Sequence, residues 1–443
     1  MAAQIKGPKI FFGWWTVLAS GLLSLWGFGY YAYGISALFL PISTELGFSR
    51  ALTSVAASIG RFEGGFEAPI AGWVADKFGP RWIVFIGIFV ASISLCLMYY
   101  IHSLWSFYLV WGLLFGTGLN TALAVPLDTA ISNWFVKKRG VALSIKWVFS
   151  GLSGVLILPL VAWLITVVGW RMACVIGGVV LGVVGLPMVW FWIKSHRPEY
   201  YGMLPDGAKM KEEDAHHEQD QDSMINKGVE YAAEVQEVEF TLRQAMKAPA
   251  YWLLILVMAV YGLVAPAINI HCIPFLMDRG ISTVMAATMM AIMIGASIPS
   301  RYIGGVIADR LDIKQLRYAM AGAYFLQAVG LIIFLFHQTV AMIYVWFILY
   351  GIGMGAGITL NPSITARYFG RKAFGLIRGT SMFFLTPVGV AAPIYAGWVY
   401  DTTGQYISAF VLFAVLLVVS SAILPFVKPP KQPEVITDIR KIA

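Results

Sequence analysis

The sequence predicts an all-α membrane protein in which twelve transmembrane helices form two six-helix halves. Three observations predict this fold class: the composition, twelve apolar stretches of membrane-spanning length, and a repeat that relates the two halves. Of 443 residues, 59% are hydrophobic and 12% are charged, with a mean hydropathy of +0.75. A soluble domain carries about 25% charged residues. The composition therefore excludes a soluble domain, a disordered chain and a disulfide-stapled secreted module.

Each apolar stretch is expected to form one spanning helix. A span needs about 20 mainly apolar residues, and backbone groups cannot stay unpaired in hydrocarbon, so these stretches must be helical. The first one is too long for the apolar core of a signal peptide. The predicted spans cover residues 14–40, 51–75, 81–101, 105–130, 141–168, 170–193, 250–277, 283–308, 316–336, 340–366, 373–400 and 404–427.

A polar linker is expected over residues 194–248, between a first half at 1–193 and a second half at 249–443. The linker holds seven Lys or Arg and twelve Asp or Glu residues, and its middle, 211–223, is predicted to be disordered. Its end is expected to form a surface turn that leads into the seventh span, with Thr241 as a helix cap.

No metal site, cofactor or disulfide is expected. His216 and His217 in the linker have no further ligand at metal-binding spacing. The three cysteines, Cys96, Cys174 and Cys272, lie inside apolar runs, where free cysteines behave as small hydrophobic residues.

The basic residues predict the orientation in the membrane. If both termini are cytoplasmic, 24 of the 31 Lys and Arg residues fall in cytoplasmic segments, three in outer loops and four within spans. We therefore expect a multi-pass protein of the cell inner membrane with both termini in the cytoplasm. The net charge of +8 is attributed to this topology and to attraction by anionic lipids, not to nucleic acid.

A repeat relates the two halves. Gly72-Trp-Val-Ala-Asp76 recurs as Gly305-Val-Ile-Ala-Asp309, 233 residues further on. An aromatic pair followed by two basic residues recurs at 134–138 and 368–372. Such a duplication is typical of transporters whose solute site lies near the membrane midplane, between the halves.

The segment GWVADKFGPRW at 72–82 resembles the loop signature of the major facilitator superfamily. The segment NWFVKKRGVALSIKWVFSG at 133–151, with Pro159, Gly169-Trp-Arg171 and Ile298-Pro-Ser-Arg301, looks like monocarboxylate transporters and oxalate/formate antiporters. The resemblance implies the major facilitator fold and a set of conformational latch residues, in which Arg81 pairs with Asp128. The implied latch residues are Gly72, Asp76, Arg81, Asp128, Gly305 and Asp309.

The chain departs from this resemblance in three places. Ser297 stands where mammalian-type members carry an Asp one turn before the eighth-helix Arg, and the first span has no counterpart of the Lys that some members use. Lys146 stands where the fifth-helix signature expects a small residue. The proton-coupling machinery of those members therefore cannot be transferred to this chain.

Six Asp, Glu, Lys or Arg residues lie more than one turn inside the ends of the predicted spans, each at an insertion cost of at least about 2.5 kcal/mol. Their formal charges sum to +2, which favours an anionic solute. Arg301 lies about 12 Å from Asp309 along its helix, near the midplane, and is predicted to bind the substrate; the alternative is a buried ion pair with a glutamate of the second helix. The six residues are Arg61, Glu63, Glu67, Lys146, Arg301 and Arg378.

Glu63 and Glu67 share one helix face, whereas Arg61 points elsewhere. We expect these three residues to serve proton coupling; the alternative is static ion pairs of the glutamates with Arg61, Lys146 or Arg378. Lys146 is predicted to be either a second substrate contact or a salt-bridge partner of the second helix, and Arg378 is predicted to snorkel.

Further polar residues within spans are weaker candidates for substrate binding. The amide and imidazole groups could bind a solute or hold helices together, and the tyrosines could line the outer pathway or belong to an interfacial belt. These candidates are Asn120, Asn269, His271, Asn361, Tyr30 and Tyr33.

The sequence predicts a secondary active transporter of small organic anions, most directly a proton-coupled carrier of monocarboxylates such as lactate or pyruvate, working by alternating access as a monomer. A dicarboxylate or formate-type exchanger and a solute-sensing membrane receptor are the alternatives; a drug exporter would need cation recognition. No nucleophile, metal or cofactor motif of an enzyme is found, so no catalytic residue is assigned.

Overall fold

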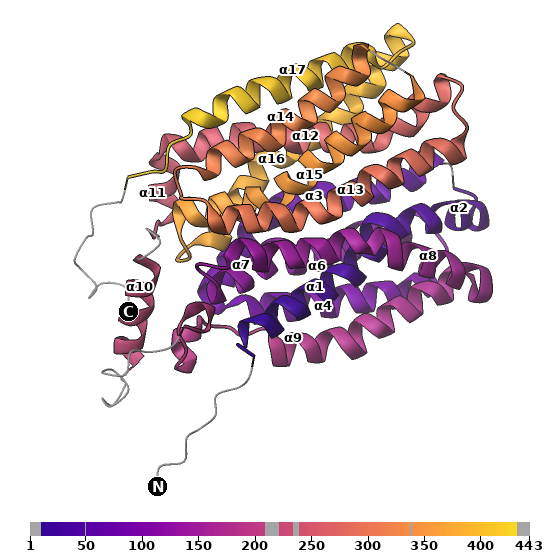
Figure 1. Cartoon of the computed structure of the whole chain (residues 1–443). Coiled ribbons are helices and arrows are strands. Elements are labelled where there is room, and N and C mark those ends of the chain that lie inside the picture. The colour runs from indigo at the N-terminus through magenta and orange to yellow at the C-terminus, as the bar shows by residue number, and fades with distance from the viewer. Residues whose placement is uncertain (1–9, 49, 209–220, 234–238, 337–338, 432–443) are drawn as a thin grey trace.

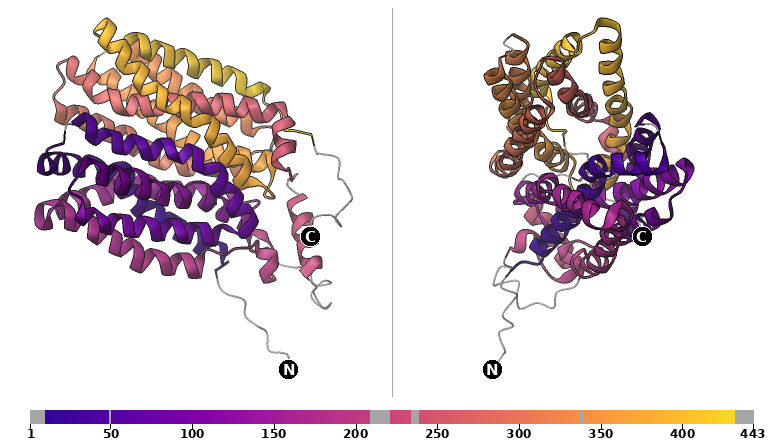
Figure 2. Two further views of the ribbon diagram at one scale, coloured as in Figure 1. Left: turned by 180° about the vertical axis from the view of Figure 1, so that it is seen from behind. Right: turned by 90° about the vertical axis from the view of Figure 1, so that its right-hand side faces the viewer.

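The computed structural model describes residues 10–48, 50–208, 221–233, 239–336 and 339–431. The described part is a bundle of long helices without a β-strand, in agreement with the predicted fold class. Figure 1 shows two groups of helices side by side, one coloured indigo to magenta and the other orange to yellow. The views in Figure 2 keep these groups adjacent.

The first half follows the predicted spans. Its first span combines α1 (Gly13–Phe28), the π-helix η1 (Gly29–Gly34) and α2 (Ile35–Leu46). The second is α3 (Arg50–Phe78), and the third is α4 (Pro80–Leu97) with η2 (Met98–Tyr100). The fourth combines α5 (Leu104–Phe107), η3 (Tyr108–Phe115), α6 (Gly116–Leu123) and α7 (Val125–Trp134).

The fifth and sixth spans form one continuous helical stretch from Arg139 to Trp192, made of α8 (Arg139–Val180), η4 (Leu181–Gly185) and α9 (Leu186–Trp192). A straight helix of this length would measure about 80 Å, more than twice the hydrocarbon thickness. Gly169 breaks it with φ 78° and ψ 161°, a conformation open to glycine because it has no Cβ. The chain therefore turns at Gly169 and crosses back.

The second half consists of six long helices. They are α12 (Pro249–Asp278), α13 (Thr283–Arg310), α14 (Leu316–Phe336), α15 (Val340–Phe369), α16 (Phe374–Thr403) and α17 (Ile407–Ile423), which continues into η8 (Leu424–Phe426).

Among the described residues, nine helices are long and apolar enough to cross a membrane. One of them is the double stretch from Arg139 to Trp192, which the Gly169 turn divides into two spans. The first span, α1 to α2, and the second span, α3, are not among these nine. With these two, the helices account for the twelve predicted spans.

Each half has its own apolar core. One set of buried residues, between Ala19 and Ile193, packs only within the first half, and a second set, between Phe240 and Val427, packs within the second half and the adjoining end of the linker. The two apolar cores therefore do not merge across the interface between the halves.

The linker lies against one end of the bundle, where α1 begins and α17 ends; we call this the terminal end (Figure 1). Its described parts are η5 (Pro198–Tyr201), η6 (Pro205–Gly207), α10 (Gln221–Ala233) and α11 (Leu242–Lys247). Thr241 caps α11 in a capping box with Gln244, as predicted. His216, His217 and most of the stretch predicted to be disordered lie outside the described residues, whereas α10 begins at Gln221.

Candidate functional site

Two aspartates join the halves at the terminal end by accepting hydrogen bonds from the first turn of a helix in the opposite half. Asp76 lies in the last turn of α3 and binds α16, and Asp309 lies in the last turn of α13 and binds α8. The donors are the backbone N–H groups of Gly375 (3.0 Å) and Leu376 (2.7 Å) for Asp76, and of Gly140 (2.6 Å) and Val141 (2.8 Å) for Asp309.

These contacts supply caps that the helices lack on their own. First-turn N–H groups have no acceptor within their helix, and the positive end of the helix dipole attracts a carboxylate. The N-cap residues of α8 and α16, Lys138 and Ala373, make no side-chain cap. Each helix is therefore capped by the opposite half.

The glycines of the repeated motif allow the helices to come this close. A Cβ atom on Gly72 would collide with the carbonyl oxygen of Gly375, and a Cβ on Gly305 would collide with that of Gly140. The motif thus combines a glycine at the helix crossing with an aspartate one turn later. The latch role predicted for these residues remains a prediction that this geometry supports.

Asp128 of α7 lies between two cations. Its Oδ1 atom is 2.9 Å from Nζ of Lys146, and its Oδ2 atom is 3.4 Å from Nε of Arg378, which belongs to the other half. The three side chains are at most 7% exposed. The prediction that Arg378 snorkels is wrong, because its guanidinium is drawn inward to this carboxylate. The salt bridge of Lys146 with the second helix is also not formed.

The predicted pair of Arg81 with Asp128 is wrong. Arg81 lies in the first turn of α4, and its Nε atom donates to the carbonyl oxygen of Ile193 at 2.8 Å. Its guanidinium lies 5.4 Å from the ring centroid of Trp190. Lys146, the residue by which this chain departs from the fifth-helix signature, neutralises Asp128 instead.

Arg301 of α13 is 4% exposed and points across the interface to α8. Its Nη1 atom donates to the carbonyl oxygen of Trp147 at 2.6 Å, and its Nη2 atom donates to Oγ of Ser297 at 3.4 Å. Both acceptors are neutral, and no carboxylate of the described residues pairs with Arg301. The alternative ion pair with a helix-two glutamate is therefore not formed.

Trp147 is a candidate site residue that the sequence analysis missed. Its carbonyl binds Arg301, Nζ of Lys146 lies 4.0 Å from its ring centroid, and its indole N–H is buried without a hydrogen-bond partner. An unpaired buried donor is costly unless a ligand or water fills the place. The signal in the sequence was an indole directly after the unexpected Lys146.

Glu63 and Glu67 face the fourth span. Oε2 of Glu63 accepts a hydrogen bond from Oγ1 of Thr117 at 3.4 Å, and Oε2 of Glu67 is buried without a partner. Neither carboxylate has a cationic partner within the described structure, so ion pairs with Lys146 or Arg378 are not formed. The side chain of Arg61 lies outside the described residues.

Four of the weaker candidates are used in helix packing. The amide of Asn120 donates to the carbonyl of Gly60 at 2.6 Å, and the hydroxyl of Tyr30, which is 0% exposed, donates to the carbonyl of Ala173 at 2.9 Å. Nε2 of His271 lies 2.8 Å from the carbonyl oxygen of Pro393. Oδ1 of Asn361 accepts a hydrogen bond from the hydroxyl of Tyr324 at 3.3 Å. The structure does not bring these four residues to Arg301.

The two remaining candidates differ from each other. Tyr33 packs against Gly154, one turn along α8 from Gly151, which itself contacts the guanidinium of Arg301. Tyr33 therefore lies close to the candidate site. Asn269 is exposed on α12 and makes no hydrogen bond with a described residue.

The polar contacts between the two halves all lie toward the terminal end. Every hydrogen bond or ion pair that joins described residues of opposite halves lies between the terminal end and Arg301, within about 12 Å along α8. In the part of the chain that the structure describes, no group of three His, Cys, Asp or Glu residues could hold a metal ion. The candidate site is therefore the buried cation Arg301 at the interface between the halves. The contacts between the halves separate it from the terminal end.

Twelve spans in two related halves, with a closure of helix caps and glycine crossings between them, define a multi-pass membrane transporter of duplicated architecture. A protein-family model with the description Major Facilitator Superfamily matches residues 17–389 of the sequence. The chain belongs to the major facilitator superfamily, and it is a transporter and not an enzyme.

Two curated relatives show the range of similarity. Monocarboxylate transporter 12 of Mus musculus is 27% identical over 380 residues, which cover 82% of this chain and 75% of the relative. The uncharacterized MFS-type transporter YcxA of Bacillus subtilis is 24% identical over 433 residues, which cover 95% of this chain and 97% of the relative.

Two solved structures share the fold. The proton:xylose symporter XylE superposes with a TM-score of 0.69 at 13% identity, covering 95% of this chain and 97% of its own. The human organic anion transporter MFSD10 superposes with a TM-score of 0.68 at 13% identity, covering 94% of this chain and 100% of its own.

Proposed function

We propose that this transporter is a secondary active carrier of small organic monoanions, such as lactate or pyruvate, that works by alternating access of halves 1–193 and 249–443. The observation that carries the proposal is Arg301, a buried cation whose described partners are neutral oxygens. A buried charge is costly unless it is paired. A substrate carboxylate offers two acceptor oxygens that match the two parallel donors of a guanidinium.

The distribution of charge favours a monoanion over a dianion. Lys146 and Arg378 share the carboxylate of Asp128, so among these three deeply placed cations Arg301 is the one that lacks a carboxylate partner. The relatives named monocarboxylate transporter 12 support the same substrate class. A dicarboxylate exchanger, which the sequence also allowed, would need a second uncommitted cation at the site.

Glu63 and Glu67 are the proposed proton carriers. A carboxylate within an apolar span that has no cationic partner is stable there in its neutral form. Thr117 supplies a hydroxyl that can bond either form of Glu63. Proton uptake at this pair would then be coupled to the movement of the substrate anion.

The terminal end is proposed to face the cytoplasm of a cell whose inner membrane holds the protein as a functional monomer. The excess of basic residues at that end, 24 of 31, supports this orientation. The conformation would then be closed to the cytoplasm, with Asp76 and Asp309 as the closing latches.

Uptake into proteoliposomes tests the proposal. Labelled lactate, pyruvate, formate, oxalate and malonate are offered to the purified protein under an imposed pH gradient. We expect uptake of a monocarboxylate that Arg301→Gln abolishes and that Arg310→Gln, an exposed cation on the same helix, leaves intact. Unchanged uptake by Arg301→Gln would refute the assignment of Arg301.

The coupling mode is tested in the same vesicles. Glu67→Gln and Glu63→Gln are expected to remove the acceleration by a pH gradient while exchange of labelled for unlabelled substrate continues. Uptake that depends on an internal counter-substrate and ignores the pH gradient would instead show an exchanger.

A further inference from the structure

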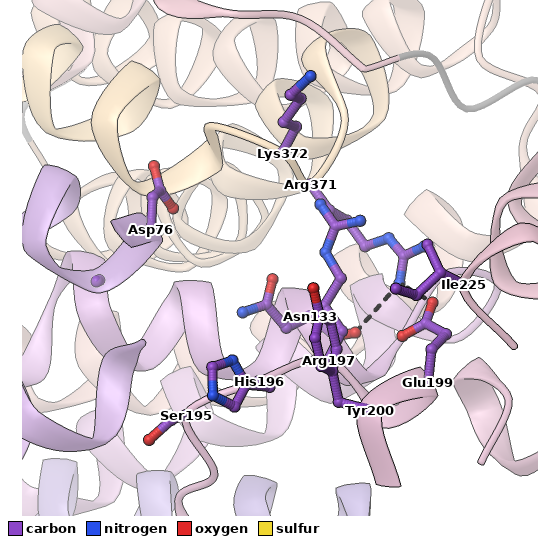
Figure 3. Close-up of a pocket in the computed structure, with 11 residues that line it drawn as sticks. Asp76, Asn133, Ser195, His196, Arg197, Glu199, Tyr200, Ile225, Arg371 and Lys372 are labelled. Carbon is purple, nitrogen blue, oxygen red and sulfur yellow. Dashed lines mark hydrogen bonds and ion pairs between the residues drawn. The ribbon is translucent and has the colours of Figure 1, made fainter. Parts of the chain in front are cut away.

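The linker forms a buried ion pair with the second half at the terminal end. Arg371, in the loop before α16, donates through Nη1 to Oε1 of Glu199 in η5 at 3.3 Å and to the carbonyl oxygen of Asn133 in α7 at 3.2 Å (Figure 3). The side chains of Arg371 and Glu199 are 1% and 4% exposed. Two opposite charges attract each other much more strongly away from water than in it. The strength of this pair therefore depends on what covers it.

Segment 198–208, which contains Glu199, is fixed to the first half. The carboxylate of Asp206 in η6 accepts hydrogen bonds from the backbone N–H groups of residues 136–138, at 2.8 to 3.1 Å. These residues lie in the loop between α7 and α8. Because Asp206 holds the segment to this loop, Glu199 is in effect a carboxylate of the first half that reaches the second.

The two loops held in this way are equivalent in the repeat. Residues 135–138 connect α7 to α8, and residues 370–373 connect α15 to α16. Both loops belong to the repeated pattern of an aromatic pair followed by two basic residues. Asp206 binds the first loop, and Glu199 binds the second through Arg371. We call these two contacts the linker joints.

Helix α10 covers both linker joints. A Cβ atom on Gly228 would collide with the carboxylate of Glu199, so α10 lies directly on the ion pair. The hydroxyl of Tyr231 donates to Oδ2 of Asp206 at 3.2 Å. The buried residues of α10 recur at every fourth position, on one face of the helix: Met224, Gly228 and Ala232.

We propose that α10 is a releasable cover that holds the terminal end closed. While α10 is docked, it excludes water from the linker joints, and segment 198–208 connects the two halves. When α10 leaves, water reaches Glu199 and Arg371, and their attraction falls to that of an exposed ion pair, which contributes little. Docking of α10 and closure of the terminal end therefore stabilise each other.

The consequence for transport rests on the proposed function. Under alternating access, the halves must separate at the terminal end, and segment 198–208 must then release Arg371. A docked α10 would slow this step, so the linker would limit the rate of transport in addition to connecting the halves.

Alkylation of a buried cysteine tests the cover without a transport assay. Thr129 of α7 is 1% exposed and faces α16, where a Cβ on Gly375 would collide with its hydroxyl. Thr129→Cys is introduced into a full-length chain in which the three native cysteines are replaced by alanine. In the purified protein, the rate of reaction with a maleimide then follows the population that is open at the terminal end.

We expect Gly228→Ala to react about tenfold faster, because the added methyl group displaces α10 from Glu199. Alanine favours helix over glycine, so the faster reaction would not come from unfolding of α10. Glu199→Gln, which removes the charge of the pair, should have a similar effect. The two factors should not multiply in the double variant, since the cover acts on this pair. Glu230→Ala, on the exposed face of the same helix, should react at the unmodified rate.

Alkylation at the unmodified rate in either Gly228→Ala or Glu199→Gln would overturn the proposal, and so would an equal acceleration by Glu230→Ala. In vesicles, Gly228→Ala should raise the rate of uptake from the terminal side. If no variant moves an organic anion while alkylation responds as expected, the proposed function is wrong and the cover is confirmed.

Discussion

Asp128 in the first half and Arg378 in the second lie 3.4 Å apart (Oδ2 to Nε), although 250 residues separate them in the chain and both are buried. Because Lys146 also binds Asp128, the ion pair between the halves belongs to a group of three charges. This group holds one more positive than negative charge. Its stability therefore depends on the single carboxylate.

Removing that carboxylate should be more damaging than removing one of the cations. Asp128→Asn leaves Lys146 and Arg378 buried without a counter-charge, and breaking a buried pair in this way costs about 3–5 kcal/mol. Lys146→Met leaves a neutral pair of Asp128 and Arg378 and should cost much less. Thermal unfolding of the two variants in detergent checks the order. Equal losses would show that Lys146 does not compensate Asp128.

The two aspartate caps are expected to act on different helices. Asp76→Ala should reduce the protection of the amides at Gly375 and Leu376, because a lost N-terminal cap costs about 0.5–2 kcal/mol. Asp309→Ala should affect the amides of Gly140 and Val141 instead. Hydrogen–deuterium exchange on both proteins gives the test, with each variant as the control for the other. Loss of protection in both helices from either single variant would contradict separate caps.

The glycines of the repeated motif should not accept even a methyl group. Gly72→Ala and Gly305→Ala place a Cβ against a backbone carbonyl of the opposite half, and such overpacking costs about 1–3 kcal/mol. Gly322→Ala in α14 meets no atom within 4 Å and should be neutral or slightly stabilising, since alanine favours helix. Tm values of the three variants check this. A tolerated Gly72→Ala would mean that the closure is looser than described.

Trp147 should influence substrate affinity through its indole N–H. Trp147→Phe keeps most of the ring and removes the unpaired donor, and we expect KM for the transported anion to rise about tenfold, as for a lost hydrogen bond to a charged group. Trp346→Phe removes an equally buried and unpaired indole N–H, but in the core of the second half, and should leave KM unchanged. A KM unaffected by Trp147→Phe would remove this residue from the site.

The fold follows from local sequence because each span is a contiguous apolar stretch, and α14 occupies the predicted residues 316–336. Asp76 and Asp309 could be found because the repeat places them at equivalent helix ends. The partners of Asp128 could not be predicted in this way. The pairing of Asp128 with Arg378 depends on how α7 of the first half and α16 of the second half are rotated about their own axes. The resemblance pointed to Arg81, but Lys146 is a departure from it and takes that place.

The contacts that the linker makes also could not be predicted from the sequence. The carboxylate of Asp206 accepts hydrogen bonds from three successive backbone N–H groups, those of Val136, Lys137 and Lys138, at 2.8 to 3.1 Å. The acidic composition of the linker predicted only a polar connection with a disordered middle. Nothing in the spacing indicates that one of twelve acidic residues reaches back to the loop between the fourth and fifth spans.

The exchange of caps between the halves has a consequence for the transport cycle. If the terminal end opens as proposed, two carboxylates and two helix starts must be rehydrated together, one set where α3 meets α16 and the other where α13 meets α8. Because the two sets are chemically alike, the caps themselves give the halves no reason to peel apart from one side. Under the proposed alternating access, the two caps therefore favour a tilt of the halves about a line that passes between the two cap contacts.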